Sequence, residues 1–232
     1  MGGTDKARRP PTAGAAGGAV DDMPAALDEL VRGATDLGES LSDAALSQCR
    51  AYLDTLLLWR QRVSLTGAST AVELVRFHVL DALHVAQFVG PGSRVADLGS
   101  GAGFPGLPLA IARPAATVVL VEPRRKRANF LRDVLRAARL HNAAVEEARV
   151  EDLHGVLAGG CDVVVSRAVW GLDVFLALAR PLLRSGGLAV AMKGPKADSE
   201  AAAVQPGFAA ADVVRYTLHG GVARRLLTYR AA

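Results

Sequence analysis

A glycine-rich loop between two acidic residues is the segment of this chain whose residue types point most directly to ligand chemistry. The segment VADLGSGAGFPG (95–106) is a short apolar run that contains Asp97 and then four glycines. A second apolar run, Thr117–Val121, is followed by Glu122. Glycines let a loop backbone lie directly against a ligand. Two strands that each end at a carboxylate beside such a loop predict a site for a nucleoside cofactor.

The loop differs from the dinucleotide fingerprint G-x-G-x-x-G. Gly99 and Gly101 fit it, but Phe104 occupies the third glycine position and the next glycine is Gly103. Asp97 directly precedes the loop, where its charge would oppose a pyrophosphate. The same acid suits the ammonium and sulfonium of S-adenosylmethionine, and Glu122 is placed to accept from a ribose. The residues favour that cofactor; a tight turn without a ligand is the alternative.

Length and composition limit the class of protein to which the chain can belong. The 232 residues suffice for one α/β domain with an extension, and no apolar segment reaches the length of a membrane span. Cys49 and Cys161 are the only cysteines, so we expect no metal site and no disulfide framework. No apolar signal sequence opens the chain, and we expect a cytoplasmic monomer. Only four of the 27 basic residues are lysines, which fits RNA binding or a genome rich in G and C.

The pattern along the chain predicts three segments. Residues 1–21 are rich in Gly, Ala and Pro and predict a disordered tail. Residues 22–90 predict a helical extension, with a capping box at Ser40-x-x-Asp43 and a second helix around 72–89. In residues 91–232 expected strands and helices alternate, which predicts the cofactor-binding domain.

The alternation predicts a mostly parallel seven-stranded sheet. The expected strands are Arg94–Asp97, Thr117–Val121, Ala143–Glu147, Asp162–Ser166, Leu188–Met192, Asp212–Leu218 and Leu226–Tyr229. The expected helices are Pro108–Ala112, Lys126–Arg139, Leu172–Leu183 and Asp198–Val204. The short loop through Gly220 and Gly221 makes the last two strands an antiparallel pair. This arrangement, with an antiparallel edge strand, predicts a Rossmann-like class I methyltransferase fold.

Polar residues follow the other expected strands as well. Ligands of open α/β sheets bind beyond the carboxyl ends of the strands, so these residues are site candidates. Glu151 follows the third strand and is placed to read an adenine amino group. Arg167 follows Ser166 at the end of the fourth strand, and Lys193 ends the fifth.

Four consecutive cations begin the helix after the second strand. They are Arg124, Arg125, Lys126 and Arg127. The helix macrodipole disfavours positive charge at that end, so a nearby polyanion such as RNA explains the cluster better than chance does. The later arginines of this helix are interpreted as an ordinary solvated face.

Several segments together resemble one known family. They are LLLWRQRVSLTG (56–67), RFHVLDAL (76–83), VADLGSGAGFPGLPLAIARP (95–114), KRANFL (126–131), SRA (166–168) and MKG (192–194). In this order they are similar to the bacterial small-subunit ribosomal RNA guanine-N7 methyltransferases, also called glucose-inhibited division protein B. The resemblance runs from about Leu53 to Gly194. One departure is Ser64, where the family usually has Asn.

The resemblance implies a function and a set of site residues. It implies methylation of a guanine N7 in 16S rRNA of the small ribosomal subunit, with S-adenosylmethionine as cofactor. It places Gly99, Phe104, Val150, Glu151 and Arg167 at that cofactor. We also expect Ser166 and Arg167 to orient the reactants. Further RNA-binding candidates are Arg76, His78 and Lys193.

The expected chemistry needs no acid or base. Guanine N7 has an exposed lone pair and no proton, so methylation requires orientation alone. No D/N/S-P-P-Y/F/W segment of an exocyclic-amine methyltransferase follows the fourth strand, and neither cysteine follows a proline. Three alternatives stay open: a small-molecule methyltransferase, a cofactor-binding ribosome assembly protein without catalysis, and a nicotinamide oxidoreductase, which the third-glycine mismatch disfavours.

Overall fold

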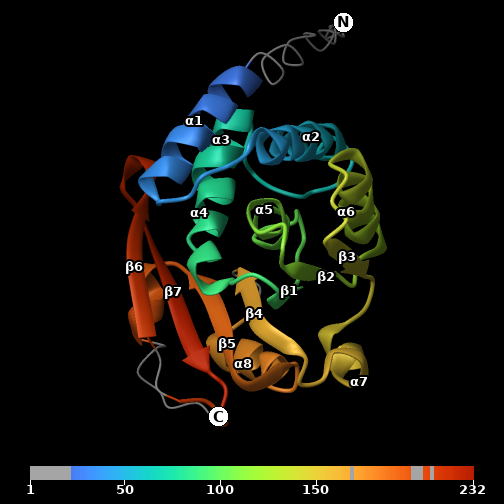
Figure 1. Cartoon of the computed structure of the whole chain (residues 1–232), viewed down its shortest axis with the longest axis vertical. Helices are drawn as coiled ribbons and strands as arrows, with labels where there is room; N and C mark the ends of the chain where they lie inside the picture. Colours follow the sequence, from blue (N-terminus) through green and yellow to red (C-terminus); the bar gives the residue numbers. More distant parts are fainter. Residues whose placement is uncertain (1–21, 168–169, 200–205, 210–211) are drawn as a thin grey trace, which may run out of the picture.

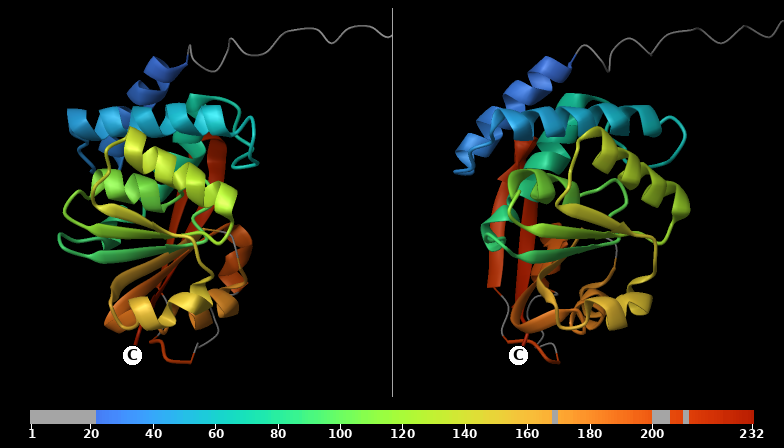
Figure 2. Two further views of the ribbon diagram at one scale, coloured as in Figure 1. Left: turned by 90° about the vertical axis from the view of Figure 1, so that its right-hand side faces the viewer. Right: turned by 45° about the vertical axis from the view of Figure 1, so that its right-hand side comes forward.

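One seven-stranded sheet with helices on both faces organises the molecule (Figures 1 and 2). The structure is a computed structural model and describes residues 22–167, 170–199, 206–209 and 212–232. The tail expected at 1–21 lies outside these residues. The strands lie in the order β3-β2-β1-β4-β5-β7-β6. Their bounds are β1 (Arg94–Leu98), β2 (Thr117–Val121), β3 (Ala143–Glu146), β4 (Cys161–Arg167), β5 (Leu183–Lys193), β6 (Asp212–Leu218) and β7 (Val222–Arg230).

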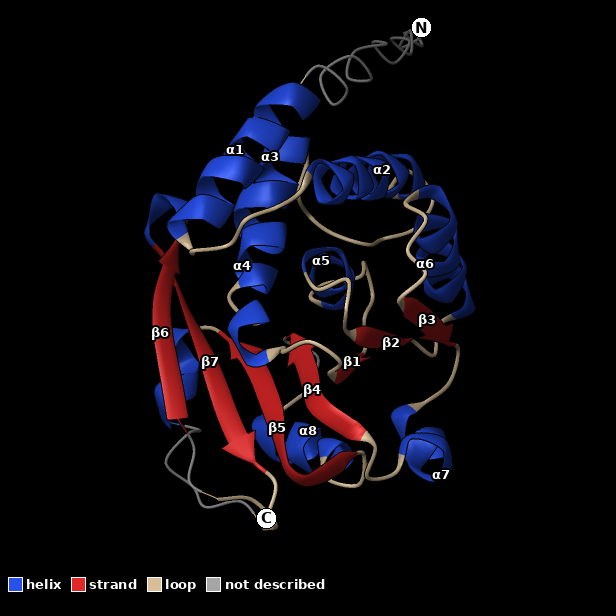
Figure 3. Cartoon of the chain, viewed as in Figure 1, coloured by secondary structure: helices blue, strands red, loops and turns tan. Residues whose placement is uncertain are grey.

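The sheet is parallel from β3 to β5, and β7 is antiparallel to both of its neighbours, β5 and β6 (Figure 3). The turn from β6 to β7 contains Gly220 and Gly221, whose φ angles are +72° and +79°. Glycine adopts such angles without the clash that a Cβ would cause. The expected fold class is confirmed, and so is the pairing of the last two strands.

The strands bury apolar residues on both faces. In β2, Val118 and Leu120 belong to one core, and Val119 and Val121 belong to the other, as the two-residue period of a strand requires. The first core also contains residues of α5 (Gly106–Ala112), α6 (Arg125–Ala137) and the N-terminal helices. The second contains residues of α8 (Leu172–Ala179) and of the short helix α7 (His154–Leu157). With both faces covered, polar groups gather at the strand ends.

The N-terminal extension packs its helices on the first of these faces (Figure 1). Its elements are α1 (Met23–Asp36), α2 (Asp43–Trp59), α3 (Ala71–Leu74), the π-helix η1 (Val75–Val79), α4 (Leu80–Leu83) and the 3-10 helix η2 (Ala86–Phe88). The capping box expected at Ser40 is wrong. The N-cap is Ser42, whose hydroxyl oxygen accepts from the Ala45 N–H at 3.2 Å, because its backbone is extended directly before the helix.

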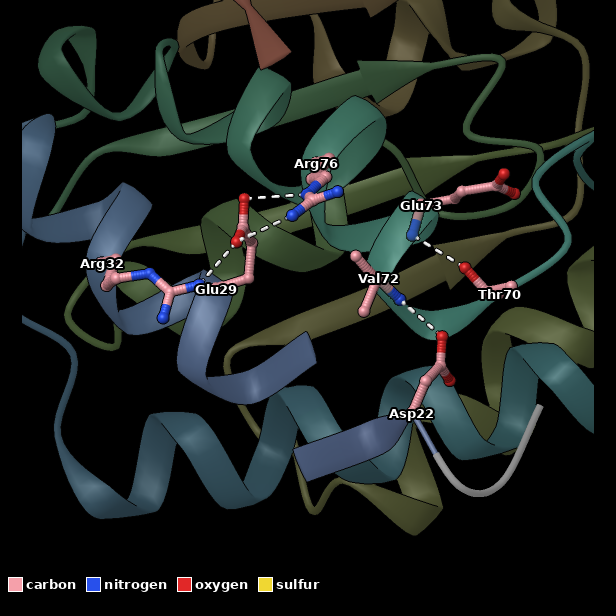
Figure 4. Close-up of polar contacts among 7 residues, drawn as sticks. All are labelled: Asp22, Glu29, Arg32, Thr70, Val72, Glu73 and Arg76. Carbon is pink, nitrogen blue, oxygen red and sulfur yellow. Dashed lines mark hydrogen bonds and ion pairs between the residues drawn. The ribbon is translucent and has the colours of Figure 1, made fainter. Parts of the chain in front are cut away.

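The helix expected around 72–89 consists of four elements, α3, η1, α4 and η2. The side chains of Thr70 and Asp22 both cap its start (Figure 4). The Thr70 hydroxyl oxygen accepts from the Glu73 N–H at 3.2 Å. The Asp22 carboxylate, at the start of α1, accepts from Ala71 and Val72 at 3.3 and 3.2 Å. After α3 the helix continues as the π-helix η1, which has a wider turn, and such π-helical turns are frequent at functional sites. This stretch contains Arg76 and His78.

Two helices expected in the second half differ from the structure. The helix predicted to run to Leu183 ends at Ala179, because Pro181 lacks the N–H that would continue it, and Leu183 begins β5 instead. The beginning of the helix predicted at 198–204 belongs to the 3-10 helix η4 (Pro195–Ser199), and 200–204 lie outside the described residues. None of the helices in the described part of the chain has the length and apolarity to cross a membrane.

Candidate functional site

The glycine loop after β1 lies against the end of β2. The N–H groups of Gly99 and Ser100 both donate to the Val121 carbonyl, at 2.9 and 3.0 Å. The φ angles of Gly99, Gly101 and Gly103 are +72°, +57° and +92°. Side chains are strained at such angles, so these glycines shape the turn.

The space around the glycines differs from one to the next. A Cβ on Gly103 would lie 2.2 Å from a Leu107 methyl carbon, so packing requires glycine there. A Cβ on Gly101 would have no neighbour closer than the Gly99 carbonyl oxygen at 3.7 Å. At Gly101 the positive φ, and not crowding, is therefore what favours glycine.

Glu122, at the end of β2, anchors this loop. Its carboxylate is buried and accepts from the Gly101 N–H at 3.0 Å and the Arg124 N–H at 2.9 Å. One side chain thus joins the loop to the start of α6. Each carboxylate oxygen accepts more than one hydrogen bond, so Glu122 retains capacity for the ribose hydroxyl expected there.

Asp97, at the end of β1, is a fully buried carboxylate with one unsatisfied oxygen. Oδ2 accepts from the Gly106 N–H at 3.0 Å, whereas Oδ1 has no hydrogen-bond partner among the described residues. Burial raises the pKa of Asp97 to about 7, although the Gly106 N–H opposes the shift. A buried half-satisfied carboxylate is costly, and an ammonium group would satisfy it. The side chain therefore fits the amino group of S-adenosylmethionine.

Tyr52 connects the N-terminal extension to the loop. Its hydroxyl donates to the Ala102 carbonyl at 2.7 Å, and its ring centroid lies 5.4 Å from that of Phe104. Phe104 is itself buried, at 4% exposure. The aromatic residue expected at the cofactor thus packs between α2 and the sheet as well. Sequence reasoning missed Tyr52, because a tyrosine among the apolar residues of a helix is indistinguishable from ordinary core.

Arg167 extends from β4 over the Phe104 ring, with its guanidinium carbon 4.9 Å from the ring centroid. Its Nη1 donates to Nδ1 of His78 at 2.9 Å. Since a guanidinium only donates, neutral His78 carries its proton on Nε2, which lies 2.9 Å from Thr66 Oγ1. Burial, with the charge of Arg167, lowers the pKa of His78 to about 4. His78 is therefore a neutral acceptor that holds a cation in place.

Asp81 is a second buried carboxylate, at 1% exposure. One oxygen accepts from the Tyr216 hydroxyl at 2.6 Å, and the other lies 3.5 Å from Arg167 and 3.8 Å from Arg224. This cluster joins α4 to β4, β6 and β7. Sequence reasoning did not single out Asp81; the available signal was a carboxylate inside the apolar helical segment RFHVLDAL (76–83).

The other strand-end residues make contacts within the protein. The buried Ser166 hydroxyl donates to the Leu98 carbonyl at 3.0 Å and so connects β4 to β1. The Lys193 ammonium donates to the Trp170 carbonyl at 2.8 Å. These two residues fix the ends of β4 and β5, beside Arg167.

The end of β3 leads into the 3-10 helix η3 (Val150–Leu153). The Val150 side chain is buried in the second core, whereas Glu151 is exposed. Of the pair that the resemblance placed at the cofactor, only Glu151 is therefore exposed in this structure.

The four consecutive cations at the start of α6 differ in exposure. Arg124, Arg125 and Lys126 are exposed, and Arg127 is half-buried and donates to the Ser64 carbonyl at 3.1 Å. Since that contact uses the backbone of Ser64, the departure from the family's usual Asn leaves it intact.

Arg76 is placed apart from this cluster. It forms a bidentate ion pair with Glu29 of α1, in which Nε and Nη2 donate to the two carboxylate oxygens at 2.9 and 3.2 Å (Figure 4). Helices α1 and α6 lie on opposite sides of the molecule in Figure 1. Of the seven RNA-binding candidates, four are consecutive residues at the start of α6, and His78 and Lys193 lie near Arg167.

Most buried polar side chains of the described residues surround this region. The six are Asp81, Asp97, Ser100, Glu122, Ser166 and Thr228, and all except Thr228 lie at or beside the carboxyl ends of the parallel strands. No group of three His, Cys, Asp or Glu residues in the described part of the chain could hold a metal ion. The site therefore consists of carboxylates, glycine backbone and arginines.

Comparison with known proteins identifies the family. The sequence profile described as rRNA small subunit methyltransferase G (GidB) matches residues 45–227. A protein named ribosomal RNA small subunit methyltransferase G from Geobacter metallireducens is 39% identical over 78% of this chain and 82% of its own length. One of the same name from Chromobacterium violaceum is 35% identical over 86% of this chain and 94% of its own.

Solved structures agree on the fold. A crystal structure titled as a "predicted O-methyltransferase" from Agrobacterium tumefaciens is 26% identical, with a TM-score of 0.57 over 66% of this chain and 81% of that one. The structure of M. jannaschii TYW2 in complex with AdoMet is 17% identical, with a TM-score of 0.51 over 66% of this chain and 74% of that one, and supports the fold alone. The chain is a methyltransferase that uses S-adenosylmethionine, and it belongs to the rRNA small subunit methyltransferase G family.

Proposed function

We propose that this enzyme methylates N7 of a guanine in 16S rRNA of the small ribosomal subunit. The observation that carries the proposal is the position of Arg167, which is held by His78, Asp81 and the Phe104 ring directly beside the glycine loop. A fixed cation next to a cofactor site suits a reaction that depends on the orientation of an RNA substrate.

The residues divide into two groups in this proposal. Those that hold S-adenosylmethionine are Asp97, Gly99, Gly101, Gly103, Phe104, Glu122, Val150, Glu151 and Arg167. The ammonium pairs with Asp97, and the ribose hydroxyls with Glu122. Those that hold RNA phosphates are the exposed cations at the start of α6.

The chemistry requires no proton transfer. The cofactor supplies a methyl group bonded to a positively charged sulfur. Guanine N7 offers a lone pair and carries no proton, so the protein must align the base and exclude competing orientations. Arg167 is proposed to align it, and Ser166 keeps the end of β4 in register with β1 through the Leu98 carbonyl. We assign no residue as a general acid or base.

A direct test maps N7-methylguanine in 16S rRNA. Reduction with borohydride, aniline cleavage and primer extension are applied to RNA from cells with and without the gene. A cleavage site that is present only with the gene supports the proposal. An identical pattern in both strains would contradict it, and methylation of small molecules alone would favour the small-molecule alternative.

The form of the substrate is a second part of the proposal. The described residues form one sheet with its helices, and their cations are dispersed over it, so we infer that these cations read RNA shape. We propose that the folded subunit is the substrate, that the enzyme acts as a monomer, and that it works in the cytoplasm. Purified protein should methylate intact small subunits faster than an isolated stem-loop, and equal rates would contradict this. Sedimentation at the assay concentration tests the monomer.

A further inference from the structure

A cavity of about 270 Å³ opens at the carboxyl ends of β4 and β5. It is enclosed by η1 and α4 on one side and by β7 on the other. Its wall is formed by His78, Asp81, Arg167, Met192, Lys193 and Arg224. It shares Arg167 with the cofactor site, so whatever binds in the cavity lies next to the reacting groups.

The charge of this wall is unbalanced. Among the described residues of the wall, the two guanidinium groups of Arg167 and Arg224 face one carboxylate, that of Asp81. His78 adds none, because burial and the neighbouring Arg167 lower its pKa to about 4. One of the two guanidinium charges is therefore left without a balancing carboxylate among the described residues of the wall.

The carboxylate satisfies the two guanidinium groups poorly. Its short hydrogen bond is to Tyr216, at 2.6 Å, whereas the contacts to Arg167 and Arg224 are 3.5 and 3.8 Å long. Both of these exceed hydrogen-bond length, so Asp81 holds the two cations close together without neutralising both. An arrangement of this kind favours an anionic guest with several acceptor oxygens.

We propose that this cavity binds a phosphate group of the target nucleotide in RNA, with Arg167 and Arg224 as its ligands and Asp81 as the residue that positions them. The proposal rests on the proposed function, because it presupposes an RNA substrate. Arginine matches phosphate geometry with two parallel N–H donors, which a guanidinium pair in a partly closed cavity provides.

The charge balance favours a phosphate over the base itself. Methyl transfer makes guanine N7 positive, so cations placed directly against N7 would oppose the reaction. A phosphodiester in the cavity carries one negative charge and would neutralise the unbalanced guanidinium charge. The base that becomes cationic would then lie beside a wall on which Arg167, Arg224 and Asp81 leave no net positive charge.

The position of Arg224 favours a phosphate of RNA over the carboxylate of the cofactor. The glycine loop follows β1, and Arg224 lies on β7, which is separated from β1 by β4 and β5. Three strand spacings amount to about 14 Å. The cofactor site and the outer wall of the cavity therefore belong to different ligands, which meet at Arg167.

Arginine side-chain NMR provides the test. Labelled protein saturated with S-adenosylhomocysteine is titrated with guanosine 3′,5′-bisphosphate, and in parallel with guanosine. The Arg224 Nε–H signal is assigned by its loss in Arg224→Gln. We expect the bisphosphate to shift the Arg224 and Arg167 signals at lower concentration than it shifts that of exposed Arg230, and guanosine to leave them in place.

Arg230 is the matched control, since it lies on the same strand and its side chain donates to the Gly186 carbonyl at the opposite end. The proposal is overturned if Arg230 shifts as early as Arg224, or if guanosine and its bisphosphate act alike. It is also overturned if Arg224→Gln lowers the affinity for S-adenosylhomocysteine, because that would place the cofactor's carboxylate in the cavity.

Methylation of small subunits separates this proposal from the function on which it rests. We expect Arg224→Gln to reduce the salt slope of subunit binding by about one, as for one lost phosphate contact, while Arg230→Gln leaves it unchanged. A wild-type protein that methylates no subunit contradicts the proposed function. If wild-type protein methylates the subunit but Arg224→Gln binds it with the same salt slope as wild type, only the phosphate site is contradicted.

Discussion

The guanidinium of Arg167 donates a 2.9 Å hydrogen bond to Nδ1 of His78, and this bond exists only while His78 is neutral. A proton on Nδ1 would replace the acceptor with a donor and set two cations against each other. The N-terminal extension therefore holds the arginine at the end of β4 through a titratable group.

We expect His78 to make stability depend on pH. The pKa of His78 is lowered from 6.5 to about 4 in the folded protein, so between these values the unfolded chain binds a proton that the folded chain does not. The contribution of His78 to the free energy of unfolding is full above pH 6.5 and falls toward pH 4, by at most about 1.4 kcal/mol per pH unit. Urea unfolding across this window measures it.

In the same pH window, Asp97 makes the free energy of unfolding change with pH in the opposite direction. The effect of His78 is therefore measured as the difference between His78→Gln and wild type. The free energy of unfolding of His78→Gln, minus that of wild type, should increase as the pH falls. A difference that stays constant with pH would show that His78 titrates equally in both states.

Asp97 should make cofactor affinity depend on pH. Its pKa is raised from 3.8 to about 7 by burial, and only the ionised carboxylate pairs with an ammonium. Affinity for S-adenosylhomocysteine should therefore fall by up to about tenfold for each pH unit below 7, as one proton must be released. Titration calorimetry across this range checks it. Asp97→Asn should bind weakly at every pH, whereas Asp54→Asn, an exposed change on α2, should follow wild type.

Tyr52→Phe should weaken cofactor binding without direct contact with the cofactor. The change leaves the Ala102 carbonyl without its 2.7 Å partner and loosens the loop. We expect a loss of about 1–2 kcal/mol in stability and up to about tenfold in cofactor affinity. Thr55→Val is the control, because it removes another hydroxyl of α2, one bonded within the helix to Ala51. If both variants bind the cofactor like wild type, Tyr52 is only a packing residue.

The cluster at the start of α6 should act on RNA alone. Arg124→Gln and Arg125→Gln, separately, should weaken subunit binding, reduce the salt slope by about one each, and leave cofactor affinity unchanged. Arg132→Gln on the same helix is the control, since Arg132 is paired with Glu147. Filter binding over a range of salt concentrations measures the slopes. Slopes equal to wild type in both variants would make the cluster an ordinary solvated helix end.

The sheet and the cofactor end of the site follow from local patterns. Strands β1, β2 and β4 contain runs of buried apolar residues, and Asp97 and Glu122 stand at the ends of the first two. Gly99, Gly101 and Gly103 between them have positive φ, which only a short list of residues tolerates. Both signals are carried by neighbours in the sequence, so they are readable without the fold.

The other half of the site depends on contacts between distant segments. Asp81 and Tyr216 are 135 residues apart, and Arg167 and His78 are 89 apart. Neither pair leaves a spacing that could be recognised in one sequence, and each residue alone is compatible with an ordinary helix or strand. The cavity at Arg224 exists only because β7 folds back beside β5.

The position of β7 between β5 and β6 also determines the order in which the last strands can join the sheet while the chain is synthesised. Strand β6 is made before β7, yet β7 is the strand that separates it from β5. During translation β6 therefore has no place in the sheet until β7 has emerged, and the edge of β5 stays open for that interval. The wall that contains Arg224 closes in the same step, so a nascent chain can complete its cofactor loop well before it can complete the cavity beside it.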